Sequence, residues 1–347
     1  MSAKNHTGRR SFLQRTAFGA GVAVLASGGR RAAARNLAPK SERLPREVWV
    51  ASIAQNGMRA GDHQQMMAMV LSRMEEVAAF QPDIVCLPEI FPFVSIAGGS
   101  PPIADVAEDP IDAVSEPFAD FAKKHHCYVV CPIFTKANGH YYNSAVFIDR
   151  NGEPMGEYRK MHPTVGEMNN GVTAGPLDPP VFRTDFGVVG AQICFDIEWT
   201  DGWQKLQEAG AEIVFWPSAY AGGATVNAKA WQHKYCVVTS TNKDTTKICD
   251  VSGEEVARTT RWNRTICAPV NLEKAFLHTW PYVRRFGDIH AKYGRKVRIK
   301  TFADEEWTII ESRSPDVHIA DVLEEFELKT HVQHLQMADE QQCACRV

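Results

Sequence analysis

Cys194 is the side chain in this sequence best placed to act as a nucleophile. It follows the apolar run 188–193 and is followed at once by Phe195 and Asp196. The run predicts a buried strand that ends in a turn, and α/β folds place reactive groups at the carboxyl ends of such strands. The alternative is a buried core cysteine, which a free cysteine often is. Charged residues elsewhere in the chain favour the first interpretation.

Glu89 follows a second apolar run, and its position is unusual for a carboxylate. Residues 84–87 read Ile-Val-Cys-Leu and predict a short strand that is buried on both faces, with Pro88 directly before Glu89. A carboxylate at the end of such a strand can serve as a general base whose surroundings raise its pKa. The alternative is an ordinary solvated loop residue.

Lys160 and Glu167 form a third candidate group. Lys160 comes at the end of a predicted strand, a loop containing Pro163 follows, and Glu167 stands seven residues after the lysine. Each charge alone is typical of a protein surface. Their combination around a proline-bounded loop is unusual.

The elements that must position these residues alternate between strands and helices, as their apolar periodicity indicates. Strands are predicted at 47–54, 84–87, 127–134, 142–149, 153–158, 181–184, 188–193, 212–218, 238–242, 247–251, 256–258 and 265–271. Helices are predicted at 63–80, 114–126, 201–209, 226–237, 315–328 and 330–341, with a basic, less regular extension starting at residue 286. Alternation predicts an α/β layered fold, and hairpin turns at 150–152 and 252–254 predict mixed sheets.

Composition excludes several classes of protein. The chain has 347 residues, enough for one large or two medium domains. Its net charge is -3, and its Lys and Arg residues are spread along the whole length. No basic surface for nucleic acid or membrane is therefore expected. Nine cysteines are sparse and odd in number, so they predict no disulfide scaffold.

Two groups of cysteines are candidates for metal or redox sites. Cys127 and Cys131, near His125 and His126, match no tetrahedral ligand spacing, so core packing is expected. Cys343 and Cys345 near the end could form a disulfide or a weak metal site, or have no role. They lack the Cys-x-x-Cys spacing of thioredoxin-like redox sites.

Residues 1–35 are predicted to be a targeting segment. They contain the twin-arginine pattern Arg9-Arg10-Ser-Phe-Leu-Gln, an apolar run at 16–26 that is too short to span a bilayer, and a small-residue cleavage site at 32–34. The segment resembles signals that export folded proteins from bacteria. We therefore expect a periplasmic or otherwise exported protein without a membrane anchor, whose reactive thiol is buried against oxidation.

Several motifs together resemble the nitrilase, or carbon–nitrogen hydrolase, superfamily across residues 47–273. They read Leu-Pro-Glu-Ile-Phe at Glu89, Tyr-Asn-Ser-Ala-Val-Phe, Tyr-Arg-Lys at Lys160, Phe-Gly-Val-Val-Gly-Ala-Gln-Ile-Cys-Phe-Asp at Cys194, and Phe-Trp-Pro-Ser-Ala. No single motif is specific, but their order and spacing are. The resemblance implies a four-layer α-β-β-α sandwich and subunits that pair through outer helices. Together with the predicted elements, it leads us to expect a hydrolase domain with mixed sheets at 36–285. An extension at 286–347 is expected to serve docking or oligomer contact.

The resemblance also implies a Glu89–Lys160–Cys194 triad that is joined by Glu167. Glu89 would take the thiol proton, and Lys160 would lower the thiol pKa and hold the tetrahedral oxyanion with the backbone N–H of Phe195. Glu167 would orient the lysine or the substrate. Hydrolysis of a C–N bond would then pass through a thioester on Cys194, without a metal or organic cofactor.

The branch of the superfamily is indicated by the residues after the cysteine. Phe195-Asp196 is closer to the Tyr-Asp of aliphatic amidases than to the Trp-Glu of nitrilases, which favours a small amide substrate. Hydrolases of N-carbamoyl amino acids carry arginines where this chain has Ile197 and Glu198. Nitrilase, N-carbamoyl amine hydrolase and a non-catalytic binding member stay as alternatives.

Five residues are candidates for lining the substrate pocket. Four are aromatic and could equally be core residues, whereas the acidic one could favour a cationic substrate or simply face solvent. They are Phe91, Phe93, Trp199, Tyr220 and Glu198.

Overall fold

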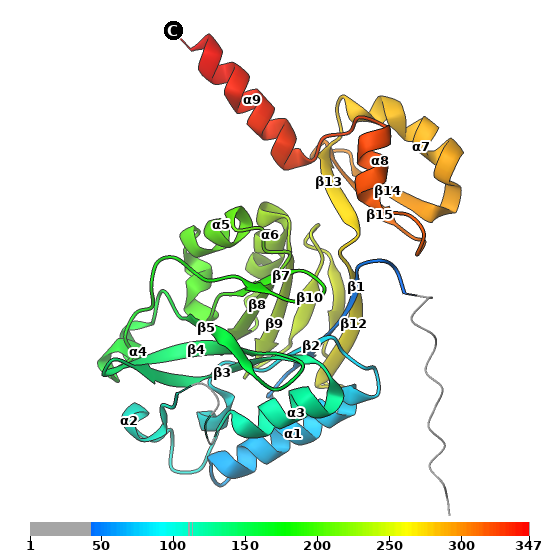
Figure 1. Cartoon of the computed structure of the whole chain (residues 1–347). Coiled ribbons are helices and arrows are strands. Elements are labelled where there is room, and N and C mark those ends of the chain that lie inside the picture. The colour runs from blue at the N-terminus through cyan, green and yellow to red at the C-terminus, as the bar shows by residue number, and fades with distance from the viewer. Residues whose placement is uncertain (1–42, 110–111, 113, 347) are drawn as a thin grey trace, which may run out of the picture. The chain divides into compact units, whose positions relative to one another are not determined.

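The computed structural model describes residues 43–109, 112 and 114–346 (Figure 1). The predicted targeting segment lies outside the described residues. None of the helices in the described ranges is both long and apolar enough to cross a membrane.

Each of the strands predicted between residues 47 and 271 is present, and they form two six-stranded mixed sheets. The first has the order β12-β1-β2-β3-β4-β5, with β1 Glu47–Ile53, β2 Ile84–Cys86, β3 Tyr128–Ala137, β4 His140–Ile148, β5 Pro154–Arg159 and β12 Thr265–Asn271. The second has the order β11-β10-β9-β8-β7-β6, with β6 Phe182–Arg183, β7 Val188–Ala191, β8 Ile213–Ser218, β9 Cys236–Thr241, β10 Lys247–Cys249 and β11 Glu255–Arg258. β1, β2 and β3 run parallel, as do β7, β8 and β9, and the other neighbours are antiparallel.

The two sheets face each other and helices cover their outer faces, so the predicted four-layer α-β-β-α sandwich is confirmed (Figure 1). Along β1, Val48 and Val50 join the core between the sheets, whereas Ala51 and Ile53 pack toward the helices. This division follows from the alternation of side chains along a strand. Helices α1 His63–Ala78 and α3 Glu116–His125 cover the first sheet, and α5 Asp201–Glu208 and α6 Gly223–His233 cover the second.

Helix α1 shows how the sequence specifies one of these layers. Asp62 caps it by accepting a hydrogen bond from the Gln65 N–H at 2.8 Å. Met66, Val70 and Met74 are buried against the sheet, so the methionine stripe is core. Helix α6 ends earlier than predicted, at His233, because Lys234 adopts a left-handed conformation and β9 begins at Cys236.

The C-terminal segment is more regular than predicted. A third sheet has the order β13-β15-β14, with β13 Lys274–His278, β14 Val297–Phe302 and β15 Trp307–Ser312. It begins before the boundary predicted at residue 286. Helix α7 is Phe286–Tyr293, and α8 is only Ile319–Glu325, shorter than the predicted helix. Val322 and Leu328 are buried in the apolar cluster of this segment, with Leu323 and Phe326 packed against it.

The last helix, α9 His331–Cys345, has no buried residue. Thr330 caps its first turn by accepting a hydrogen bond from the Gln333 N–H at 3.3 Å. Leu335, which was expected to dock, is 48% exposed. The large apolar side chains of this helix are therefore only partly covered within the described chain.

Candidate active site

Glu89 lies at the carboxyl end of β2, buried to 4% exposure. Its loop is held by two amides: Asn242 Nδ2 donates to the Glu89 carbonyl at 2.9 Å, and Gln55 Nε2 donates to the Phe91 carbonyl at 2.8 Å. Ile90 has a φ of 38°, in the left-handed region that β-branched residues rarely adopt. Strained backbone of this kind persists where surrounding contacts fix it, and it often occurs at functional sites.

Lys160 follows β5 and is almost fully buried, with 1% exposure. Its Nζ donates to Glu89 Oε1 at 2.8 Å and to Glu167 Oε2 at 2.8 Å. The structure thus brings together three of the predicted residues from distant parts of the chain. The lysine is held between two carboxylates in a site that water barely reaches.

Glu167 is positioned by a one-turn helix, α4 Val165–Asn169, where the sequence predicted a loop. Its carboxylate accepts from the Thr164 N–H at 2.8 Å, while the Thr164 hydroxyl accepts from the Glu167 N–H at 3.2 Å. This is a capping box, and the pattern Thr-x-x-Glu predicts it from sequence alone.

Asn143 on β4 is a member of this cluster that the sequence analysis did not single out. Its Nδ2 donates to Glu89 Oε1 and to Glu167 Oε1, each at 2.8 Å. Its backbone carbonyl also accepts from the Lys160 N–H at 2.9 Å. This one residue therefore joins both carboxylates and fixes the start of the loop 160–164, called the lysine loop below. The Tyr-Asn-Ser motif marked the strand, but only the fold places this side chain.

Cys194 opens a short 3-10 turn, Cys194–Glu198, called the cysteine turn below. It has a φ of 46° and is 7% exposed, so the expected burial of the thiol is present. Trp216 Nε1 donates to the Cys194 carbonyl at 3.0 Å. The Ser218 side chain and the Ala219 N–H, at the carboxyl end of β8, form hydrogen bonds that favour the thiolate.

The pKa of the Cys194 thiol is raised to about 12, because burial and the charge of Glu89 outweigh the opposing effect of Lys160. The sequence analysis expected Lys160 to lower this pKa. The ammonium does act in that direction, but burial is the larger effect, so the resting thiol keeps its proton. A base must therefore remove that proton when the sulfur attacks.

The pKa of Lys160 moves in the opposite direction. Burial alone would lower it, but the charges of Glu89, Glu167 and Cys194 raise it above its ordinary value. The pKa of Glu167 is lowered: burial would raise it, but the Lys160 charge and the hydrogen bonds from Lys160 and Asn143 prevail. The site therefore carries a permanent cation beside an ionised carboxylate.

Asp196, two residues after the cysteine, fastens the cysteine turn to the lysine loop. Its fully buried carboxylate accepts from the Ile193 N–H at 2.8 Å, from the His162 N–H at 2.8 Å and from the Tyr158 hydroxyl at 2.6 Å. The Tyr158 hydroxyl in turn accepts from the Met161 N–H at 3.1 Å. One carboxylate thus holds both segments that carry Cys194 and Lys160.

The five pocket candidates separate into two groups. Phe91 and Phe93 are fully buried with the core residues between the first sheet and its helices, which is the core-packing alternative. Trp199 and Tyr220 are 39% and 37% exposed, and Glu198 is also exposed. Tyr220 follows the Ser218–Ala219 segment at the thiol, and its N–H donates to Ser218 Oγ at 3.2 Å.

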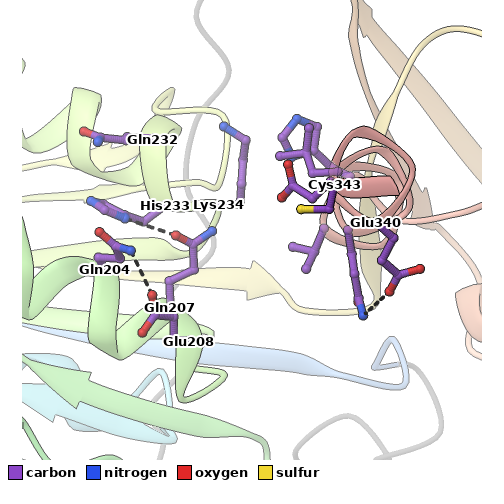
Figure 2. A pocket seen from close by; sticks show the side chains of 13 residues that line it. Gln204, Gln207, Glu208, Gln232, His233, Lys234, Glu340 and Cys343 are labelled. Atoms are coloured by element: carbon purple, nitrogen blue, oxygen red, sulfur yellow. Dashed lines mark hydrogen bonds between the residues drawn. The ribbon is translucent and has the colours of Figure 1, made fainter. Parts of the chain in front are cut away.

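A wide groove lies away from this cluster. Gln207 and His233 on the α5–α6 side and Glu340 and Cys343 on α9 line its opposite walls (Figure 2). None of the four predicted catalytic residues lines it. Buried charge and nucleophile, rather than the volume of this groove, therefore identify the candidate active site.

In the part of the chain that the structure describes, no group of three or more His, Cys, Asp or Glu could hold a metal ion. Cys127 and Cys131 are buried in the core with the pKa of each thiol raised by burial, as core packing implies. Cys343 and Cys345 are exposed free thiols on α9.

The sequence profile of the carbon-nitrogen hydrolase family matches residues 50–275. The chain belongs to this family. A β-ureidopropionase from Arabidopsis thaliana is 37% identical over 121 residues, covering 33% of this chain and 30% of that protein. A deaminated glutathione amidase from Dictyostelium discoideum is 30% identical over 162 residues, covering 42% of this chain and 56% of that protein. The chain thus spans from under a third to just over half the length of these two relatives.

Solved structures share the fold at lower identity. A variant of the amidase from Nesterenkonia sp. AN1, with the acetamide moiety of fluoroacetamide added covalently at its active site cysteine, aligns with a TM-score of 0.58. The two chains are 17% identical, and the match covers 67% of this chain and 93% of that one. This likeness shows the fold.

Proposed function

We propose that this protein is an amidase that hydrolyses small amides through a thioester on Cys194. One observation carries the proposal: Lys160 is held with 1% exposure between Glu89 and Glu167, and its charge and that of Glu89 act on the Cys194 thiol. A buried cation beside a protonated thiol and a carboxylate suits acyl transfer, in which a proton must move and an oxyanion must be stabilised.

The first half of the reaction forms the acyl-enzyme. Glu89 removes the proton from Cys194 as the sulfur attacks the amide carbon, and the carbonyl oxygen becomes an oxyanion held by Lys160 and the Phe195 N–H. The C–N bond then breaks, and ammonia or an amine leaves with the proton that Glu89 received. The thioester remains on the cysteine.

The second half releases the acid. Glu89 takes a proton from water, the resulting hydroxide attacks the thioester carbon, and Lys160 again holds the oxyanion. The C–S bond breaks, the carboxylic acid leaves and the proton returns to the thiolate. Glu167 keeps Lys160 oriented through the hydrogen bonds described above. No step needs a metal or an organic cofactor.

A screen of substrates tests this function. Small aliphatic amides, N-carbamoyl amines and nitriles would be offered to wild type and to Cys194→Ala, with ammonia release as the readout. We expect wild type to turn over amides and Cys194→Ala to show no turnover. The circular dichroism spectrum of Cys194→Ala should match that of wild type, which shows that the fold is kept. Equal turnover by both proteins, or turnover of nitriles alone, would contradict the proposal.

A second candidate is an N-carbamoyl amine hydrolase, and the similarity to a β-ureidopropionase favours it. A ureido group is a carbamoylated amine, so the same attack would release carbon dioxide in addition to ammonia. Ile197 is buried and Glu198 is exposed where a cationic pair would be needed to hold a substrate carboxylate. We therefore propose that N-carbamoyl compounds carrying a nearby carboxylate are poor substrates, and carbon dioxide release would distinguish the two candidates.

We also propose that the protein forms a homodimer or higher homo-oligomer, with the segment 286–347 providing contacts. Val332 and Leu335 on α9 are 59% and 48% exposed and line the groove opposite α5 and α6. A second copy of the chain could cover them. Light scattering of wild type and of a Val332→Glu, Leu335→Glu variant tests this: an oligomer that the variant weakens is expected, and a monomeric wild type would contradict it.

We propose that the segment 1–35, with its arginine pair, directs export of this protein from the cytoplasm. A bacterium expressing the full chain should hold the processed protein in its periplasmic fraction, and Arg9→Lys, Arg10→Lys should retain it in the cytoplasm. Unchanged fractionation of the variant would contradict export by this route.

A further inference from the structure

His162 occupies the junction between the two segments that carry Lys160 and Cys194. Its ring Nδ1 lies 3.0 Å from Asp196 Oδ1, and its backbone N–H donates to the same oxygen at 2.8 Å. Its ring Nε2 lies 3.6 Å from Asp201 Oδ2, at the start of α5. The side chain is 14% exposed.

The ring also rests on the cysteine turn through an aromatic contact. It stacks on Trp199 with the ring centroids 4.2 Å apart and the planes at 2°. Trp199 in turn meets the Phe195 ring edge-on at 5.0 Å. Phe195 provides the backbone N–H proposed as an oxyanion donor. His162 thus contacts the middle of the cysteine turn through Asp196 and the residue that follows the turn, Trp199.

The two carboxylates define the protonation state that this geometry needs. An ionised carboxylate only accepts hydrogen bonds, and a neutral imidazole has one N–H to donate. A neutral ring would therefore turn a lone pair toward either Asp196 or Asp201. Only the imidazolium can present an N–H to each, and a cation also favours stacking on a tryptophan face.

Other charged groups near the ring do not change this conclusion. On the cysteine turn, Glu198 adds a further negative charge beside Trp199. The Tyr158 hydroxyl already donates to Asp196. From α6, Lys229 Nζ donates to the Trp199 carbonyl at 2.6 Å, so its charge is already paired with a backbone oxygen.

We propose that His162 is a positioning residue whose protonated ring holds the cysteine turn against the lysine loop, so that hydrolysis is lost on the alkaline side when this ring deprotonates. This proposal rests on the proposed amidase function. Independently, the pKa of His162 is raised above its ordinary value: the hydrogen bond to Asp196 contributes most, burial opposes it, and the charges of Asp196 and Asp201 add to it. The charged form, and the arrangement it holds, therefore persists below that raised pKa and is lost as pH rises through it.

The test is the pH profile of kcat/KM for wild type, His162→Asn and Asp201→Asn. In His162→Asn, the amide can still donate to Asp196 but does not titrate. We expect its kcat to be lower by on the order of 10- to 100-fold and its KM to change little. The alkaline limb assigned to His162 should be absent from its pH profile. His162→Ala, which cannot donate, should be slower still. Asp201→Asn should keep the plateau of the wild type and move the limb to lower pH by a few tenths of a unit.

A second measurement separates this proposal from the proposed function. Titration of the His162 ring by NMR needs no turnover, and its midpoint should fall in Asp201→Asn. If no substrate is hydrolysed, the amidase proposal fails, and the NMR midpoint still supports or contradicts the charged state of His162. An alkaline limb in His162→Asn identical to that of wild type, or a ring midpoint unmoved by Asp201→Asn, would overturn the proposal.

Discussion

Two lysines in this protein, Lys160 fully buried and Lys234 partly buried, have opposite environments. Lys160 lies between the carboxylates of Glu89 and Glu167. Lys234, just after α6, instead has its Nζ over three aromatic rings, 3.3 Å from the Trp307 centroid, 4.7 Å from that of Phe276 and 5.2 Å from that of Trp231. Within the residues that the structure describes, no ion pair joins Lys234 to a carboxylate.

The difference shows what decides the charge of a buried amine. Burial alone would lower the pKa of both lysines. For Lys234 it is the dominant effect and brings the pKa to about 7. For Lys160 the neighbouring carboxylates and thiol reverse the effect, and its pKa is raised. Aromatic rings attract a cation more weakly than carboxylates do. The candidate active site therefore holds a fixed positive charge. The three rings around Lys234, called the aromatic box below, hold a charge that titrates near neutrality.

Replacing each lysine by methionine is the change with the largest expected contrast. Lys160→Met removes an oxyanion donor, which costs about 10²–10³ in kcat, and leaves two buried carboxylates without their cation, which costs roughly 3–5 kcal/mol of stability. Amide turnover and urea unfolding measure both effects. Lys234→Met is the matched control, because it removes a partly buried amine that has no carboxylate partner among the described residues. It should keep full turnover and change stability by no more than about 2 kcal/mol. Equal loss of activity in both variants would contradict the assigned difference.

The two carboxylates that hold Lys160 should also differ from each other. Glu89→Gln preserves the size of the side chain but cannot accept the thiol proton, so kcat should fall by about 10²–10⁴. Glu167→Gln should reduce kcat by roughly 10-fold, because it only loosens the orientation of Lys160. Equal effects of the two substitutions on kcat would show that Glu89 has no separate role as a base.

The lowered pKa of Glu167 adds a pH dependence to this pair. Its contribution to stability is present above the ordinary glutamate pKa of 4.5 and is lost as pH falls through the lowered value. Glu167→Gln should therefore be less stable than wild type at pH 7, and the gap should close in acid. A difference in the free energy of unfolding that stays constant with pH would contradict the claim that Glu167 is ionised.

Alkylation rates test the protonated state of the resting thiol. Because its pKa is raised to about 12 and the side chain is 7% exposed, Cys194 should react with iodoacetamide at pH 8 more slowly than the exposed thiols Cys343 and Cys345. Peptide mass spectrometry after timed quenching gives the three rates. Faster labelling of Cys194 than of both α9 thiols would indicate a preformed thiolate.

The smallest expected effect concerns Lys234 and pH. Its folded-state pKa of about 7 lies below the ordinary value of 10.5, so the unfolded chain binds more protons between these values and stability rises with pH there. Wild type should thus gain thermal stability relative to Lys234→Met between pH 7 and pH 10. A difference that stays flat or reverses would indicate that Lys234 remains charged in its aromatic box.

Strand positions and the residues that follow them could be predicted because buried strands leave a clear apolar pattern. Glu89 and Cys194 were found in this way, and the family motifs linked them to Lys160. The capping box at Thr164 was also readable, but the proline before it suggested a loop. The third sheet was missed although apolar and charged residues alternate from Val297 to Lys300, a pattern typical of a strand with one buried face. The density of basic residues in this stretch suggested an irregular extension instead.

Other features depend on three-dimensional packing and have no local signal. Asn143 bonds two carboxylates only because the first sheet places β4 next to β5 and separates it from β2 by the single strand β3. Phe91 and Phe93 follow Glu89 in sequence, but the short turn that contains them directs both rings into the core. The raised pKa of Cys194 follows mainly from burial. A sequence does not show how large the effect of burial is compared with that of the Lys160 charge.

The central claim is that Cys194 carries the acyl group during hydrolysis of an amide. Wild type is mixed with an amide that it hydrolyses and is quenched in acid within one turnover. Its intact mass should then show the added mass of the acyl group. Peptide mapping should place it on Cys194, and Cys194→Ala should carry none. An adduct on any other residue, or amide turnover at the wild-type rate in Cys194→Ala, would contradict this account.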